Sequence, residues 1–324
     1  MTMALALRRG DRRTSVPPAL HGNLWTDDLA FQRGVVQVRT TGASVPIDAA
    51  LAWDVARWLA FYLPVRVKAG LHRLVKPGPR VAFTPHAPRP WYLIWVASAW
   101  AGARFVRDPA TADVVFRFED QTLAEPSPAD VGAINGACLD VSKSRVASVF
   151  EAVFGYALAI DPEVHQGPAV EKGEANGVHD GRIVQCPTQR LPGRTYQRLI
   201  DNIENGLSTD LRTPFVGGIP ALVYIKQRPQ AARFANMNSR VRLTTVEAVF
   251  SSAEVATLVA FAKAMDLDWG GLDVLRDRAD GRLYVVDVNK TDMGPPLALP
   301  WLDKLRSTRT IAKALKPLLQ GARP

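Results

Sequence analysis

The most informative stretch of the chain reads Gly271-Leu-Asp-Val-Leu-Arg276, then Asp277-Arg-Ala-Asp-Gly281, then Arg282-Leu-Tyr-Val-Val-Asp-Val-Asn289. Its outer parts have the composition of β-strands, and its middle part has the composition of a turn. A hairpin centred on Asp280 pairs residues that are equidistant from it, and this places Asp273 directly opposite Asp287. The side chain of Asn289, two residues further on, points to the same face of the hairpin.

The two opposed carboxylates predict a metal site. Asp273 and Asp287 repel one another at a Cβ separation of about 5 Å, unless a cation or a proton lies between them. Together with Asn289 they form a set of hard oxygen donors, which suits Mg²⁺ or Mn²⁺ and not zinc. The alternative is that both aspartates cap turns or pair with arginines, but polar residues that interrupt a Leu-Tyr-Val-Val strand favour the metal.

Further candidate residues precede the hairpin. Lys143 opens a helix expected over Ser142–Phe154, and Lys172 ends an expected strand just before the glycine-containing loop Gly173–Gly181, which holds His179. They are followed by Tyr196-Gln197-Arg198-Leu199-Ile200, by Asp210-Leu211-Arg212 and by a hairpin turn at Gly217-Gly218. In this order, ending with Asp273 and Asp287-Val288-Asn289, these residues resemble the motifs of the ATP-grasp superfamily.

This resemblance, which covers about residues 76–310, implies an α/β (α+β) fold with several domains. An ATP-grasp fold of two α+β subdomains follows a small parallel-sheet βαβ domain. The implied divisions are an N-terminal extension with one amphipathic helix (1–75), the βαβ domain (76–138), the ATP-grasp N-subdomain or lid (139–198) and the C-subdomain with the metal site (199–324).

The resemblance also implies an ATP-dependent ligase. Such an enzyme joins a small-molecule or peptide carboxylate to an amine, or less often a thiol, through an acylphosphate, and releases ADP and phosphate. The implied cofactors are ATP and Mg²⁺ (or Mn²⁺). The expected roles are metal binding for Asp273, Asp287 and Asn289, phosphate binding for Lys143 and Lys172, adenine binding for Gln197, Arg198, Leu199 and Ile200, and further nucleotide contacts for Asp210 and Arg212.

Arg228 and Lys172 are the candidate catalytic residues. Arg228 is selected from the basic residues that follow the Gly217-Gly218 turn, Lys226, Arg228, Arg233 and Arg240. It ends a strand expected to line the cleft, and a guanidinium fork suits the developing charge of an acylphosphate. Two other functions stay open: a small-molecule kinase with the same fold, and a protein without turnover that binds nucleotides or an anionic surface.

The region before the motifs predicts a helix and a βαβ unit. Leu51, Val55, Leu59 and Leu63 recur at helical spacing from Pro46 onward, and Pro64 is expected to end that helix. A basic connector follows. Val81–Thr84, Trp91–Ala103 and Ala112–Phe118 read as strand, helix and strand, which favours a parallel sheet. We expect the first helix to pack on the apolar Trp91–Ala103 helix, whereas residues 1–46 read as irregular.

Composition sets the outer limits. The 324 residues are 47% hydrophobic and 22% charged, which is typical of a globular protein and predicts about two domains. The net charge of +9, with Arg8, Arg9, Arg12 and Arg13 near the start, attracts anions in general. Neither a membrane span nor a secretory signal is expected. Two cysteines indicate a reducing, cytoplasmic location. We expect no nucleic-acid partner, and the oligomeric state stays open.

Overall fold

The computed structural model describes residues 28–38, 44–75, 78–177, 180–235 and 238–321. The chain forms two compact units that divide between Leu51 and Ala52, and each unit is described by itself. The predicted divisions at residues 75, 138 and 198 remain predictions.

The first unit contains a three-stranded antiparallel sheet in the order β1-β2-β3. Its strands are β1 (Leu29–Gln32), β2 (Val35–Val38) and β3 (Ser44–Pro46). The interpretation of residues 1–46 as irregular is therefore wrong for this part, and residues 1–27 lie outside the described residues. The missed signal is the Arg33-Gly34 pair between two short apolar runs, since Gly34 turns the chain at a φ of 80°.

Helix α1 spans Ala49–Val75 and contains Pro64. The prediction that the helix ends before Pro64 is wrong, and most of the expected basic connector is helical. Phe61, Val65 and Ala69 are buried on both sides of the proline, and their packing compensates for the hydrogen bond that proline removes. They contact Trp95, Val96 and Ala99 of helix α2, so the predicted packing between these two helices is confirmed.

The predicted βαβ unit is also confirmed. Strand β4 (Arg80–Pro85) leads into α2 (Leu93–Ala101), and the chain returns through β5 (Arg104–Phe105) and β6 (Val114–Phe118). Both β5 and β6 pair with β4 in parallel. Helix α2 is buried along nearly its whole length, which explains why its sequence shows no polar face.

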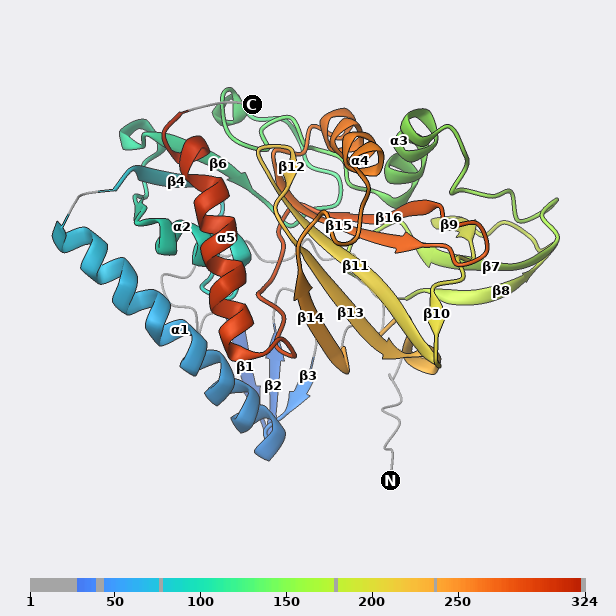
Figure 1. Ribbon diagram of the computed structural model, residues 1–324, viewed down its shortest axis with the longest axis horizontal. Helices are drawn as coiled ribbons and strands as arrows, with labels where there is room; N and C mark the ends of the chain where they lie inside the picture. The colour runs from blue at the N-terminus through green and yellow to red at the C-terminus, as the bar shows by residue number, and fades with distance from the viewer. Residues whose placement is uncertain (1–27, 39–43, 76–77, 178–179, 236–237, 322–324) are drawn as a thin grey trace. The chain divides into compact units, whose positions relative to one another are not determined.

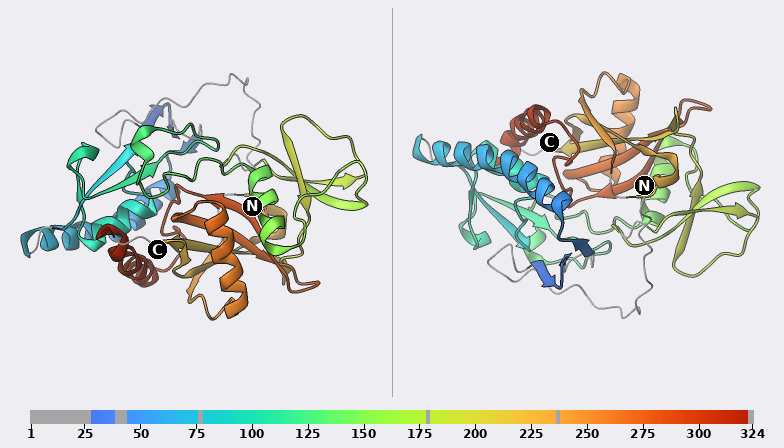
Figure 2. Two further views of the ribbon diagram at one scale, coloured as in Figure 1. Left: turned by 90° about the horizontal axis from the view of Figure 1, so that it is seen from above. Right: turned by 90° about the horizontal axis from the view of Figure 1, so that it is seen from below.

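A second region contains helix α3 (Lys143–Phe154) and the antiparallel sheet β8-β7-β9. Ser142 caps the start of α3, and Gly155 ends it at a φ of 77°. The strands are β7 (Gly167–Gly173), β8 (Arg182–Cys186) and β9 (Arg194–Arg198). Figure 2 shows this sheet projecting beside the large sheet, and we call it the lid sheet.

The composition of Ala157–Ile160 and of Thr195–Ile200 predicts two strands in this region, and both predictions need correction. The segment Ala157–Ile160 forms one isolated bridge, from Ala159 to Gln197, instead of a strand. It crosses β9 irregularly, with Arg198 donating its N–H to the Leu158 carbonyl. The strand expected over Thr195–Ile200 ends at Arg198, because the chain then turns and Asn202 donates its N–H to the Ile200 carbonyl.

The large sheet is antiparallel and has the strand order β14-β13-β11-β15-β16 (Figure 1). Its strands are β10 (Ile203–Glu204), β11 (Leu207–Val216), β12 (Ile219–Pro220), β13 (Val223–Pro229), β14 (Arg240–Thr244), β15 (Trp269–Arg276) and β16 (Leu283–Asn289). Gly217 and Gly218 form the predicted hairpin turn, both at positive φ.

Two helices complete the core. Helix α4 (Ser252–Ala264) begins with a capping box of Ser251 and Glu254 and packs with α3 against β11, β15 and β16. Helix α5 (Trp301–Leu319) places Ile311 and Leu315 in a core shared by α2, β4, β6 and the large sheet. None of the helices within the described residues has the length and apolar character needed to cross a membrane.

Candidate active site

The site is built on the β15–β16 hairpin. Asp273 lies directly opposite Asp287, and Gly271 lies opposite Asn289, so the predicted pairing of the two carboxylates is confirmed. Beyond Asp273 the register shifts by one residue, and Val274 faces Val285 instead of the equidistant Val286. This irregularity is a β-bulge, a feature that often lies beside active sites.

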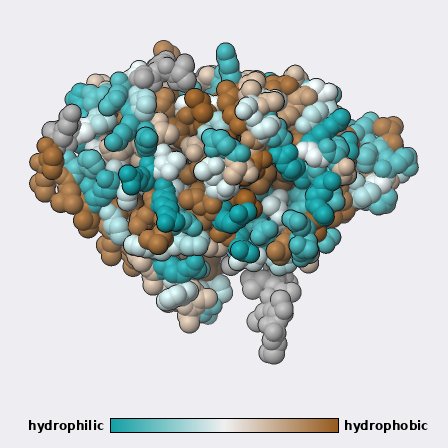
Figure 3. All heavy atoms as spheres, in the orientation of Figure 1, coloured by the Kyte–Doolittle hydropathy of each residue, from teal (hydrophilic) through white to brown (hydrophobic). Residues whose placement is uncertain are grey.

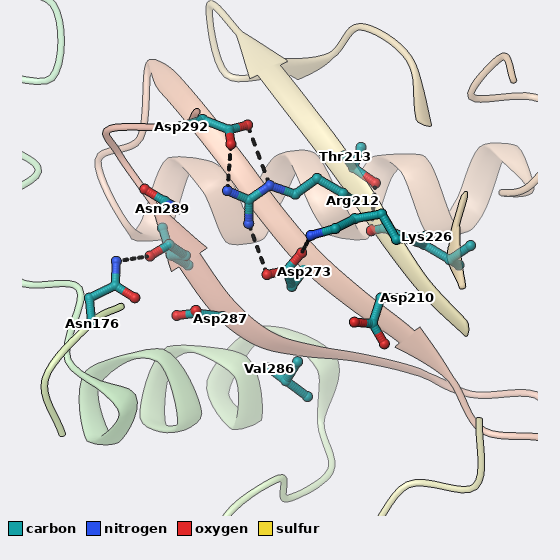
Figure 4. Close-up of polar contacts among 12 residues, drawn as sticks. Asn176, Asp210, Arg212, Thr213, Lys226, Asp273, Val286, Asp287, Asn289 and Asp292 are labelled. Atoms are coloured by element: carbon teal, nitrogen blue, oxygen red, sulfur yellow. Dashed lines mark hydrogen bonds and ion pairs between the residues drawn. The ribbon is translucent and has the colours of Figure 1, made fainter. Parts of the chain in front are cut away.

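Each carboxylate of the pair is held by cations and not by the other carboxylate, and Figure 4 shows Arg212 and Lys226 against Asp273. Arg212 on β11 lies 2.9 Å from an oxygen of Asp273 and 2.7 Å from an oxygen of Asp292. Lys226 on β13 lies 3.7 Å from the second oxygen of Asp273. Pairing with an arginine, the alternative considered for these aspartates, is thus present for Asp273.

Asp287 and the bulge are contacted from the lid side. Lys143, the first residue of α3, donates a short hydrogen bond to Asp287. Lys172, near the end of β7, donates to the Val286 carbonyl at 3.0 Å. The two lysines predicted from the sequence therefore both contact strand β16.

Burial and charge act against each other at these residues. Burial alone raises the pKa of Asp273, but Arg212 and Lys226 hold the pKa of this carboxyl well below its usual range. Burial lowers the pKa of Lys172 to about 8, although Asp287 opposes that shift. Asp273 therefore stays ionised through the physiological range, and Lys172 keeps most of its charge at pH 7.

The close packing of the Arg212 ion pairs depends on a glycine. A Cβ atom at Gly271 would lie 2.7 Å from Nε of Arg212, a distance that would force the backbone and the guanidinium apart. Arg212 and Asp292 are both buried. Gly271 thus lets the Asp292–Arg212–Asp273 row lie close against β15.

The donor set on the hairpin fits a hard divalent cation. Oδ1 of Asp273 is buried and accepts no hydrogen bond from the described residues, which leaves a lone pair for a metal. Oδ1 of Asn289 accepts the Thr291 N–H at 3.1 Å and keeps a second lone pair. Among the described residues no group of three or more His, Cys, Asp or Glu gathers. Two carboxylates and an amide match Mg²⁺, which shares its remaining positions with water and phosphates.

A pocket lies between the lid sheet and the large sheet. Nine of the predicted site residues line it: Lys143, Lys172, Gln197, Arg198, Ile200, Asp210, Arg228, Asp273 and Asp287. Leu199, Arg212 and Asn289 do not line it, although Arg212 contacts Asp273 from behind. Nε2 of Gln197 is buried in this wall without a hydrogen-bond acceptor among the described residues, and an acceptor on a bound nucleotide would satisfy it.

Arg228 and Asp210 form an ion pair with each other at the pocket wall. Asp210 also accepts a hydrogen bond from Asn202 at 3.1 Å. Arg228 is buried and donates a second hydrogen bond to the Ala235 carbonyl. The two residues predicted for different roles therefore form one fixed unit.

The loop after β7 is fastened over the site by one side chain. Asn176 accepts a hydrogen bond from Lys143 at 3.0 Å and donates to the Val288 carbonyl at 3.3 Å (Figure 4). Its backbone N–H donates to the Thr122 hydroxyl at 2.7 Å. His179, noted in the sequence of this loop, lies outside the described residues.

Two site residues were not predicted from the sequence. Lys226 was one of several basic residues after the hairpin turn, and its alternation with Arg228 on β13 is the signal that could have paired them on the pocket face. Asp292 follows Asn289 by three residues, and nothing in its sequence context shows that it is buried against Arg212.

Comparisons with known proteins give structural neighbours alone. No family model matches the chain, and no curated protein matches it. The chain is similar to an L-amino acid ligase from Bacillus licheniformis, with 13% identity, a TM-score of 0.46 and coverage of 76% of this chain and 75% of that chain. It is also similar to a RiPP-associated ATP-grasp ligase from Chryseobacterium gregarium, with 12% identity, a TM-score of 0.45 and coverage of 76% and 98%.

A third neighbour is the ATP-grasp ligase PsnB complexed with its minimal precursor, with 16% identity and a TM-score of 0.37. The match covers 62% of this chain and spans 61% of the length of PsnB. Two of these three neighbours are ATP-grasp ligases by name.

Proposed function

We propose that this protein is an ATP-dependent ligase of the ATP-grasp type, which joins a carboxylate to an amine. The observation that carries the proposal is the pairing of Asp273 with Asp287 inside a pocket that Lys143, Lys172 and Lys226 also line. Opposed carboxylates surrounded by lysines suit a triphosphate with its divalent cation, because both signs of charge must be neutralised there.

The proposed reaction has two steps. A carboxylate oxygen of a small molecule or peptide attacks the γ-phosphorus of ATP, the bond to the β-phosphate oxygen breaks, and an acylphosphate and ADP form. The amine nitrogen then attacks the acyl carbon, phosphate leaves with the bonding electrons, and the nitrogen loses a proton. Both steps depend mainly on positioning and charge neutralisation.

The residues divide these tasks between them. Asp273, Asp287 and Asn289 would hold Mg²⁺, which supplies positive charge to the phosphate oxygens when bound. Lys143 and Lys172 bind the phosphates, and Lys143 can exchange its contact with Asn176 for a phosphate oxygen. Because Lys172 is buried and desolvated, its interaction with a phosphate is strong.

The remaining predicted residues shape the far wall of the pocket. Arg228, held by Asp210, steadies the charge on the acylphosphate. The segment from Gln197 to Ile200 receives the adenine. Arg212 acts from behind the wall, since its ion pairs with Asp273 and Asp292 fix the Asp273 carboxylate in place. We also propose a cytoplasmic location, which the two free, buried cysteines support.

The proposal is tested by ADP formation over mixed pools of acids and amines with Mg²⁺. Asp287→Asn should lower the rate about a hundredfold or more, because it removes a metal-binding charge and keeps the shape. Asp303→Asn on α5, which does not line the pocket, is the matched control and should stay within about twofold of wild type.

Two results decide between the possible functions. Full activity of the Asp287→Asn variant with Mg²⁺ would contradict the assignment of the metal site. ADP formation that requires an acid and rises with a suitable amine supports a ligase, whereas ADP formation that no amine affects, with a stable phosphorylated product, indicates the kinase.

A further inference from the structure

Helix α1 has two apolar faces, and the structure covers one of them. Phe61, Val65 and Ala69 are buried against α2. An α-helix turns by about 100° per residue, so positions on the opposite side follow one another at intervals of three and four. The opposite face is therefore a separate surface, and its residues can be named from this spacing.

The opposite face is exposed and apolar. It is formed by Ala56, Leu59, Leu63, Val67 and Leu74, with Gly70 between the last two. Leu63 is 57% exposed, Val67 is 62% exposed and Leu74 is 85% exposed. Figure 3 shows hydrophobic residues gathered over the α1 helix, which runs along the lower left of the view. Isolated exposed leucines are ordinary, but a continuous row of them marks an interaction surface.

Basic side chains border this apolar face along both of its sides. The helical spacing places Arg66 and Arg73 on one border and Arg57 on the other. Lys68 lies near the Arg57 border, but its ammonium group packs over the Trp100 ring of α2. Asp54, which pairs with Arg57 at 3.7 Å, lies toward the buried side. The row is thus apolar at its centre and positively charged at both edges.

The apolar surface continues onto the start of α5. Trp301 is 46% exposed, and its ring N–H donates to the Ala60 carbonyl at 3.1 Å. Leu297 and Leu302 beside it are also exposed, and Arg57 donates to the Leu297 carbonyl at 2.7 Å. A fixed, exposed tryptophan at the edge of an apolar face is typical of a surface that meets lipid headgroups.

We propose that this face of α1 binds the surface of a lipid bilayer that carries anionic headgroups. The helix lies along the bilayer with its apolar row at the level of the upper acyl chains. Arg66 and Arg73 extend toward the phosphates, as long basic side chains do at such borders, and Arg57 stays bonded to the Leu297 carbonyl at the other edge. At 27 residues the helix presents a row about 40 Å long.

Two observations favour this occupant over others. The helix cannot insert across the bilayer while Phe61 and Val65 are packed on α2, so it binds in the plane of the surface. A second copy of the chain would bring two sets of basic borders together. Asp54 is the single acidic residue of α1, so the like charges of the two copies would repel.

The test is sedimentation of the full chain with vesicles. One set contains phosphatidylcholine alone, and the other contains phosphatidylcholine and phosphatidylserine in a two-to-one ratio. Wild type should bind the anionic vesicles, and its partition should fall as salt is raised. Leu63→Gln with Leu74→Gln should lower that partition about tenfold or more, because two large apolar side chains no longer enter the bilayer.

A matched control replaces two exposed apolar residues outside α1. Val131→Gln with Val164→Gln, at positions 88% and 70% exposed, should bind the vesicles as wild type does. Far-UV circular dichroism should show the same helix content for all three proteins, because none of these residues is buried. Arg66→Gln with Arg73→Gln should weaken binding to the anionic vesicles alone.

Three results would overturn the proposal. The first is no binding of wild type to anionic vesicles at low salt. The second is equal binding of wild type and the Leu63/Leu74 variant, which would point to the arginines at positions 8–13. The third is a wild-type dimer in light scattering that the Leu63/Leu74 variant converts to a monomer without vesicle binding, which would identify a second copy as the occupant.

Discussion

On the β15–β16 hairpin half-buried charged side chains are paired within the fold, whereas on helix α1 apolar side chains are exposed. Arg212 and Lys226 lie around Asp273, so this charge has its partners inside the protein. The exposed row of α1 has no such partner among the described residues of its own unit. The first arrangement is stable as it stands, and the second gains free energy only when something covers it.

This difference separates two kinds of functional region. A buried, paired charge is held in a defined place by its neighbours, which is what a reaction that depends on positioning needs. No other part of the protein packs over the exposed side chains of an apolar row. Such a surface suits a partner of variable shape. The following predictions test the contrast, beginning with the change that should have the largest effect.

The largest effect should come from removing the central cation of the hairpin. Arg212→Met removes the ion-pair partner of the buried Asp292 and one of the two cations beside Asp273, and we expect the free energy of unfolding to fall by about 3–5 kcal/mol. Arg306→Met, which breaks an exposed ion pair with Asp303, should change it by about 0.5 kcal/mol or less. Urea unfolding of the three proteins measures both effects.

A small loss for Arg212→Met would break the comparison. A loss under about 1 kcal/mol would mean that Asp273 and Asp292 are not desolvated in solution. The hairpin would then be a solvated surface like any other, and its ion pairs would not fix the carboxylates.

The two faces of α1 should differ in the cost of shortening a side chain. Phe61→Ala on the buried face should lower the free energy of unfolding by about 3 kcal/mol, because it leaves a cavity against α2. Leu63→Ala, two residues away and 57% exposed, should lower it by about 0.5 kcal/mol or less. Thermal and urea unfolding in the absence of lipid give both values, and equal losses would show that the free protein already covers both faces.

Local patterns in the sequence account for the parts of the fold that were predicted correctly. Strand composition on both sides of Asp277–Gly281 was enough to place Asp273 opposite Asp287. Ser142 and Gly155 were enough to bound α3. These features depend on residues that are close together in the sequence, so the local sequence is enough to predict them.

The errors in the predictions arise where contacts between residues far apart in the sequence determine the structure. Periodicity identified α1 as a helix but selected Val55, Leu59 and Leu63 as its buried face, whereas these residues are exposed. Because both faces are apolar, hydropathy cannot show which one α2 covers. The bulge at Val286 and the burial of Asp292 behind Arg212 likewise follow from the packing of several strands. Patterns in a single sequence do not contain information on that packing.

The smallest effect concerns Lys304, a buried cation that lacks the partners found on the hairpin. Lys304 is 3% exposed, and within the described part of the chain no carboxylate lies at ion-pair distance from its ammonium group. Burial lowers the pKa of Lys304 to about 8, and Arg57 lowers it further while Asp54 opposes the shift. The unfolded chain therefore binds more protons at this side chain between about pH 8 and its ordinary pKa.

Lys304→Met should accordingly raise the free energy of unfolding at pH 7 by about 1–2 kcal/mol, because it removes the cost of burying a charge. The stability of wild type relative to the variant should rise with pH above about 8, where the folded protein loses this proton and the unfolded chain keeps it. Urea unfolding at pH 7, 8, 9 and 10 measures the difference. A variant less stable than wild type at pH 7 would mean that Lys304 has an anionic partner in solution. Lys304 would then be a paired charge, as the charged residues of the hairpin are.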